Sequence, residues 1–251
     1  MSEEILKALM QLFGLITKQD GGVGSNETEY VRMFLMQQLN SEAVEEYFSL
    51  FAKYSEEEQK RLSKESEGNE SEKVQLTSMK DSVRILGICK KINKQLNREQ
   101  KVVVLIRLYE LVSSDMKMTE QRMAIINTVA DVFKIPKNEV TEIESFVFQS
   151  APEKLDYSNI LIADDSSYEN VNFKHIQTTG LKGSVLILNV KSAELYFMRY
   201  AGDAAQDIFL NGLLINNKNV YIFPKGSFIR LPKGKPIYYT EIGRASCRER
   251  V

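Results

Sequence analysis

The segment Lys18-Gln19-Asp20-Gly21-Gly22-Val23-Gly24-Ser25-Asn26-Glu27 decides the fold of the first half of the chain. It follows the stretch Ile5–Ile16, in which apolar residues recur at the spacing of a helix face. Gly21 and Gly22 are expected to end that helix, because glycine readily adopts the positive φ of a helix end. Ser25 is expected to cap the next helix with its hydroxyl group. The segment therefore predicts two helices joined by a tight turn.

A second copy of this pattern occurs later in the chain. The stretch Leu105–Asp115 parallels Leu9–Asp20 with one residue of slippage. In each copy a helix ends at an Asp, a short turn follows, and a hydroxyl side chain (Ser25 or Thr119) opens a new helix. Two such units predict an all-α helical bundle with an internal pseudo-repeat over residues 1–150.

The pattern changes after Ala151-Pro152 to short β-rich runs separated by turn residues. Asn211-Gly212 is a strong hairpin signal, because both residues tolerate positive φ. Short strands at close spacing predict an all-β sandwich over residues 151–240, with a small barrel as the alternative. The chain is thus expected to be an α+β protein of two domains. The expected strands are Ile160–Ile162, Val185–Val190, Leu195–Tyr200, Ile208–Leu210, Val220–Phe223, Phe228–Leu231 and Ile237–Tyr239.

Residues 241–251 form a third segment. The run from Glu241 to Val251 is similar to the translation of a common sequencing adapter, so we expect an artefactual tail without a packed structure of its own. Removing its three arginines and two glutamates takes the basic residues from 33 to 30 and the acidic residues from 34 to 32. The remaining net charge of −2 gives no electrostatic reason to expect nucleic-acid binding.

Composition also indicates the cellular compartment. Cys89 is the only cysteine outside the tail, so an internal disulfide is not expected and a cytoplasmic setting fits best. Cys89 lies in an apolar helical stripe and is expected to be a small core residue. No apolar run approaches the roughly 20 residues that a membrane-spanning helix needs, so direct membrane insertion is not expected.

The first turn resembles the signature of the TerB-like domains of tellurite resistance. Asp20, Val23 and Glu27 occupy the positions that this family gives to an Asp, a small apolar residue and a Glu. In the second copy Asp115, Met118 and Thr119 fit, whereas Met116 replaces the glycine and Arg122 stands where the Glu is expected. The resemblance implies an all-helical cytosolic domain that binds a divalent metal through its acidic turns.

Asp20 and Glu27 are accordingly the candidate metal ligands, since carboxylate oxygens suit a hard cation. The residues themselves favour a structural role: an Asp at a helix end bonds turn amides, and a Glu in the first helical turn complements the helix dipole. Two carboxylates without a third or fourth oxygen donor are few for a cation that takes about 6–8 ligands. No other cofactor is expected.

The β-rich half resembles a degenerate forkhead-associated (FHA) domain. His175 and Asn211 match that family's loop-bracing His and peptide-binding Asn, and Asn172 stands at its Ser position. The resemblance implies phosphopeptide binding at these residues, with Lys174 or Arg199 as a substitute cation. The family's phosphate-binding Arg is missing, because Asp164-Asp165-Ser166 occupies its place, and carboxylates there would repel phosphate. A lone His beside apolar residues is more typical of a hydrogen-bonded structural residue than of a catalyst.

Together the two domains resemble the N-terminal region of certain bacterial ABC transporter ATP-binding proteins. No phosphate-binding Gly-x-x-x-x-Gly-Lys-Ser/Thr loop occurs in these residues, so we expect a non-catalytic regulatory region whose nucleotide-binding domain is missing. Its partner would be another protein, including the missing ATPase and membrane domains. The alternative is a stand-alone cytosolic stress-response adaptor that binds a divalent metal or a phosphoprotein.

Overall fold

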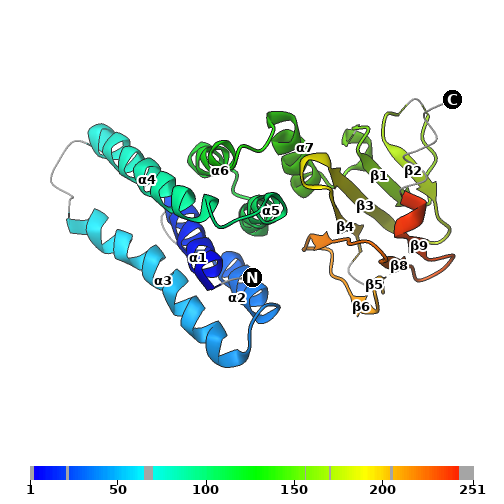
Figure 1. The fold of residues 1–251 in the computed structure, drawn as a ribbon, viewed down its shortest axis with the longest axis horizontal. Helices are drawn as coiled ribbons and strands as arrows, with labels where there is room; N and C mark the ends of the chain where they lie inside the picture. The colour runs from blue at the N-terminus through cyan, green and yellow to red at the C-terminus, as the bar shows by residue number, and fades with distance from the viewer. Residues whose placement is uncertain are drawn as a thin grey trace. The chain divides into compact units, whose positions relative to one another are not determined.

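The computed structural model describes residues 3–20, 23–64, 70–155, 157–169, 171–203 and 206–242, without the side chains of residues 20 and 56–81. The chain forms two compact units, Met1–Ile135 and Pro136–Val251. The first is helical and the second contains two β-sheets (Figure 1). The predicted α+β class, with a helical region followed by a β-rich region, is confirmed.

Helix α1 lies at the centre of the helical unit and contacts α3, α4, α5 and α6 (Figure 1). Eleven of its 15 residues are buried, because its apolar residues extend around most of the helix and not along one stripe alone. Gly14 permits a close approach to α3: a Cβ there would lie 2.8 Å from that of Tyr54. The helices of this unit are α1 (Glu3–Thr17), α2 (Ser25–Met36), α3 (Ser41–Lys64), α4 (Glu70–Asn93), α5 (Arg98–Asp115) and α6 (Glu120–Phe133).

Two features of α4 bear on the sequence predictions. Cys89 is completely buried, as expected for a core residue, and burial raises the pKa of its thiol to about 12. No helix in the described part of the chain, α4 included, is long and apolar enough to cross a membrane.

The predicted pseudo-repeat corresponds to α1–turn–α2 and α5–turn–α6. Thr119 caps α6 as expected, with its hydroxyl oxygen accepting a hydrogen bond from the Arg122 N–H at 3.5 Å. The cap of α2 is one residue earlier than predicted, at Gly24, and Ser25 is the first helical residue. Glu27 explains the shift, because its side chain reaches back to accept the Gly24 N–H at 2.7 Å and so replaces the hydroxyl cap.

Met116 shows why a glycine belongs in this turn. It is the C-cap of α5 and has a left-handed backbone with φ 57°, which strains an L-residue with a side chain. Its side chain is 66% exposed, so little packing compensates. We predict that Met116→Gly raises the free energy of unfolding by about 0.5–1 kcal/mol, measured by urea denaturation. Met118→Gly, in the same turn without a positive φ, should not stabilise the chain.

Helix α7 (Lys137–Phe148) belongs to the second unit, so the compact units divide earlier than the expected boundary at residue 150. The reason is its contacts with the sheet. Glu139 accepts a hydrogen bond from the Ser192 N–H at 2.8 Å, and Glu142 accepts one from Asn159 at 2.6 Å. The guanidinium of Arg199 lies 5.7 Å from the ring centre of Phe146.

The β unit is a sandwich of two sheets, with strand orders β2-β1-β3-β4-β7 and β6-β5-β8-β9. Buried residues from both sheets, such as Ile187 of β3 and Ile229 of β8, form one core. All seven predicted strands are present. Strand β2 was not predicted, and β6 was implied only as the second strand of the Asn211-Gly212 hairpin. The bounds are β1 (Ile160–Asp164), β2 (Lys174–Gln177), β3 (Gly183–Val190), β4 (Leu195–Gly202), β5 (Phe209–Leu210), β6 (Leu213–Leu214), β7 (Tyr221–Ile222), β8 (Phe228–Arg230) and β9 (Ile237–Tyr238).

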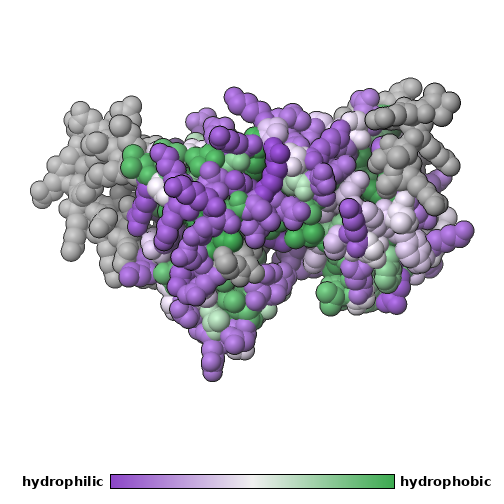
Figure 2. All heavy atoms as spheres, viewed as in Figure 1, coloured by the Kyte–Doolittle hydropathy of each residue, from purple (hydrophilic) through white to green (hydrophobic). Residues whose placement is uncertain are grey.

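Strand β6 follows the predicted Asn211-Gly212 turn, where φ is 51° and 86°. Leu213 and Leu214 are 75% and 59% exposed. Figure 2 shows hydrophobic surface where Figure 1 places β6.

The start of the expected artefactual tail is part of the fold. Ile242 is only 2% exposed and belongs to the core of the sandwich. Glu241 accepts a hydrogen bond from the Tyr238 N–H at 3.1 Å. The prediction that residues 241–251 lack packed structure is therefore wrong for Ile242, because a large apolar side chain at this point fills the core. Residues 243–251 lie outside the described residues.

Candidate functional site

The first candidate site lies in the helical unit and consists of Glu27, Asp115 and Arg122, which we call the turn site. Glu27 is the third residue of α2 after its cap, and Arg122 is the third residue of α6 after its cap. Both side chains are completely buried, and they form an ion pair with 2.8 Å between Arg122 Nη2 and Glu27 Oε1.

Asp115 completes the turn site at the end of α5. Arg122 Nη1 lies 3.0 Å from each of its carboxylate oxygens and donates a longer hydrogen bond of 3.4 Å to the carbonyl oxygen of Lys117. Burial raises the pKa of Glu27, while the Gly24 N–H and Arg122 act in the opposite direction. One guanidinium group thus links two acidic side chains from different helices.

The turn site bears on the metal prediction. Both oxygens of Glu27 are already engaged, one by the Gly24 N–H and the other by Arg122. The Asp20 side chain, the other predicted ligand, lies outside the described residues. Because a buried guanidinium already faces Glu27 and Asp115, these residues do not fit a resident divalent cation, which needs several free oxygen ligands.

A second cluster of polar side chains surrounds Asp164, the last residue of β1. This carboxylate is 3% exposed and accepts hydrogen bonds from Tyr168 at 2.7 Å, Ser184 at 2.8 Å and the Ser166 N–H at 3.0 Å. His175 Nε2 lies 2.9 Å from Oδ1 of the same carboxylate. Burial by itself would raise the pKa of Asp164, but these hydrogen bonds hold it below its usual value.

The Asp164 cluster corrects one interpretation of the sequence. We expected the carboxylates of Asp164 and Asp165 to repel phosphate, whereas the side chain of Asp164 is buried and bonded to the protein. His175, on the neighbouring strand β2, braces this cluster, which fits the expected structural role. The hydrogen bond to Asp164 also raises the pKa of Tyr168, to about 12, after the larger effect of burial.

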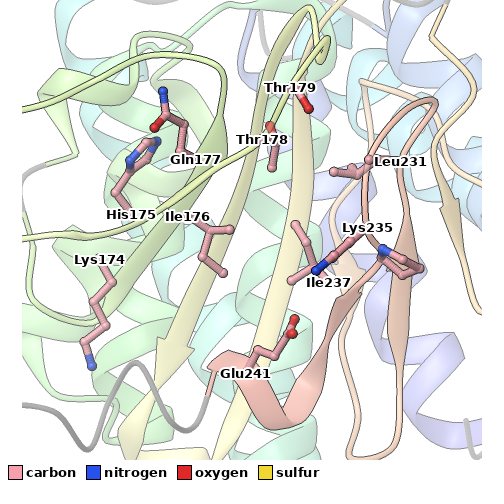
Figure 3. Close-up of a pocket in the computed structure, with 12 residues that line it drawn as sticks. Lys174, His175, Ile176, Gln177, Thr178, Thr179, Leu231, Lys235, Ile237 and Glu241 are labelled. Carbon is pink, nitrogen blue, oxygen red and sulfur yellow. The ribbon is translucent and has the colours of Figure 1, made fainter.

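The third candidate site is a groove of about 750 Å³ at one side of the sandwich, which we call the edge groove (Figure 3). Its walls come from two outer strands, β2 on one sheet and β9 on the other. It is lined by Lys174, His175, Ile176, Gln177, Thr178, Thr179, Leu231, Gly234, Lys235, Pro236, Ile237 and Glu241.

The edge groove contains only part of the predicted phosphopeptide site. Lys174 and His175 line it, but Asn172 and Asn211 do not. Asn211 instead holds the β5–β6 hairpin against β8, since its amide group donates to Ser227 Oγ at 3.0 Å and accepts the Phe228 N–H at 3.0 Å.

Thr178 was not singled out from the sequence. It is 8% exposed, and its Oγ1 has no hydrogen-bond partner among the residues that the structure describes. A buried hydroxyl group normally has a partner, and the Oγ1 of Thr178, which lies beneath the surface of the groove, is an exception. In the sequence, the feature that could have drawn attention to Thr178 is the run Thr178-Thr179-Gly180, which follows Lys174–Gln177 and is typical of a strand end.

The fold and the turn site define a class of protein: a bundle of two helix–turn–helix units with acidic turns, followed here by a β-sandwich. The family described as Tellurite resistance protein TerB matches residues 6–145. That match covers more than half of the chain, so the chain belongs to the TerB family. No curated protein and no solved structure matched the chain.

Proposed function

We propose that this TerB-family chain is a non-catalytic protein-interaction module that binds an extended acidic segment of a partner protein in the edge groove. The observation that carries the proposal is the position of β2. It is the outer strand of its sheet among the described strands, so its second edge can pair with an added strand.

The side chains of the edge groove indicate the chemistry of the segment. Lys174 and Lys235 bring two positive charges, while the carboxylate of Glu241 already accepts the Tyr238 N–H. Ile176 and Ile237 provide an apolar floor between the two edges (Figure 3). A strand that carries an acidic residue and a β-branched residue two positions apart, and so on one face, would place its carboxylate near a lysine and its apolar side chain on the isoleucines.

A peptide with the repeat Glu-Ser-Val-Ser, which puts Glu and Val on the same face of a strand, tests this proposal. We expect it to bind the whole chain, as measured by fluorescence anisotropy, and Lys174→Glu/Lys235→Glu to weaken binding at least about tenfold because both contacts become repulsive. Lys218→Glu, an exposed lysine outside the groove, is the matched control and should bind like the unaltered chain. Equal affinity of the double variant and the control would contradict the proposal.

The same assay separates the phosphoprotein alternative. A peptide with phosphothreonine in place of one Glu carries more negative charge and three acceptor oxygens. Binding of this peptide alone would favour the stand-alone adaptor, with Lys174 and Lys235 as the phosphate contacts.

We also propose that the module acts on the cytoplasmic side as the front region of an ABC-type ATPase. The support is the resemblance of the domain arrangement, now including a confirmed TerB domain. Sequencing the gene without adapter contamination tests this proposal: a phosphate loop encoded after the sandwich is expected, and a stop codon directly after Thr240 would contradict it.

A further inference from the structure

Glu27 and Arg122 occupy the same position in the two halves of the pseudo-repeat. Each is the third residue after the cap of its helix, and each helix follows a turn that begins near an Asp. The two equivalent side chains meet in the interior of the bundle, where both are completely buried. At this meeting point, like charges would repel strongly, because water does not screen them.

The protein itself compensates part of the negative charge at this point, since one guanidinium group faces the carboxylates of Glu27 and Asp115. Arg122 contacts Glu27 at 2.8 Å, Asp115 at 3.0 Å and the Lys117 carbonyl oxygen at 3.4 Å. These oxygens come from three parts of the fold: α2, the end of α5 and the following turn. A single cationic group that gathers oxygens from separate segments does what a bound metal ion does in other proteins.

We propose that Arg122 is a built-in cation that makes the turn site independent of divalent metal, and that position 122 decides whether the bundle uses a guanidinium group or a bound ion. An acidic residue at this position would leave three carboxylates, at positions 27, 115 and 122, around one buried point. Such a cluster requires a cation, and carboxylate oxygens are the ligands that Mg²⁺, Mn²⁺ and Ca²⁺ take.

The proposal is tested by making position 122 acidic in the whole chain. The Arg122→Glu variant should fold completely only when a divalent ion is present. With Mn²⁺ at about 100 times the Kd of the Mn²⁺ complex, its Tm should be roughly 5 °C or more above the Tm of the same variant in EDTA. Electron paramagnetic resonance should show one bound Mn²⁺ in this variant. The Tm of the unaltered chain should be the same in Mn²⁺ and in EDTA.

The matched control is the charge-inverted variant Glu27→Arg/Arg122→Glu, which restores one pair of opposite charges at the two equivalent positions. Its Tm should not respond to Mn²⁺.

Two results would overturn the proposal. One is Mn²⁺ binding by the unaltered chain that Glu27→Gln abolishes, since Glu27 would then be available to a metal. The other is an Arg122→Glu variant that neither binds Mn²⁺ nor regains helical circular dichroism with it, whether that variant is folded or unfolded at the start.

Discussion

Arg122→Met is expected to lower the free energy of unfolding of the helical unit by about 3–5 kcal/mol, the range for breaking a buried ion pair by removing one partner. The side chain of Arg122 is completely buried, as is that of Glu27, while Asp115 is 8% exposed. Methionine fills a similar volume but leaves the Glu27 carboxylate buried without a cation. Urea denaturation followed by circular dichroism of the helices measures the loss.

A second variant separates the loss of charge balance from the loss of packing. In Glu27→Met/Arg122→Met both buried charges of the pair are removed, so we expect part of the stability to return, because well-packed apolar replacements of such pairs are often neutral. The rest stays lost, because Asp115 still lacks its guanidinium partner and the Gly24 N–H loses its acceptor. Arg98→Met, at the exposed start of α5, is the matched control and should change stability by less than about 0.5 kcal/mol. If Arg122→Met behaves like Arg98→Met, the turn site does not stabilise the bundle.

The sequence predicted the parts of the turn site but not their pairing. The repeated turns, the Thr119 cap and the departure at Arg122 are all local features that spacing reveals. The contact of Glu27 with Arg122 joins residues 95 positions apart in the chain. Because it depends on how the two helix–turn–helix units pack, no local pattern signals it, and the acidic first turn alone left a metal ligand and a structural residue as two interpretations of Glu27.

The β unit was also predicted only in part from local sequence patterns. Strands β3 and β4 were predicted because they are buried in the middle of a sheet and have continuous apolar runs. Strand β2 was missed because Lys174, His175 and Gln177 make it polar, which suits an outer strand. Its parallel pairing with β1, with His175 opposite Ile162, is set by tertiary structure. The edge groove, which β2 helps to line, could therefore be recognised only in the folded structure.

Asp164 was misjudged for a related reason. In the sequence it begins an acidic loop, yet its partners Tyr168, His175 and Ser184 come from later segments that the sheet brings around it. A carboxylate with four hydrogen-bonding partners in a buried place is a strong stabilising element once those partners are assembled.

Asp164→Ala should therefore lower the free energy of unfolding of the β unit by about 3 kcal/mol or more. The substitution leaves the buried hydroxyl group of Ser184 without its acceptor, and an unsatisfied buried donor costs about 1–3 kcal/mol. It also removes the hydrogen bonds of the half-buried Tyr168 hydroxyl group and of the exposed Ser166 N–H, each of which contributes about 1 kcal/mol. Asp164→Asn keeps the size and one acceptor oxygen, so its loss should be smaller. Urea denaturation followed by tyrosine fluorescence, with Tyr200 and Tyr239 packed on the core of the sandwich, measures both losses.

The acid sensitivity of the sandwich gives an independent readout for the same carboxylate. The pKa of Asp164 is lowered in the folded chain, so its contribution to stability is complete above the unfolded pKa of about 3.9 and is lost as the pH falls through the folded value. Asp164→Asn has no such group and should lose less stability than the unaltered chain between about pH 5 and pH 2. Asp165→Asn is the matched control, because the side chain of Asp165 is exposed, and it should keep the acid sensitivity of the unaltered chain. Parallel pH profiles of Asp164→Asn and the unaltered chain would show that the buried carboxylate is not the group whose protonation weakens the β unit.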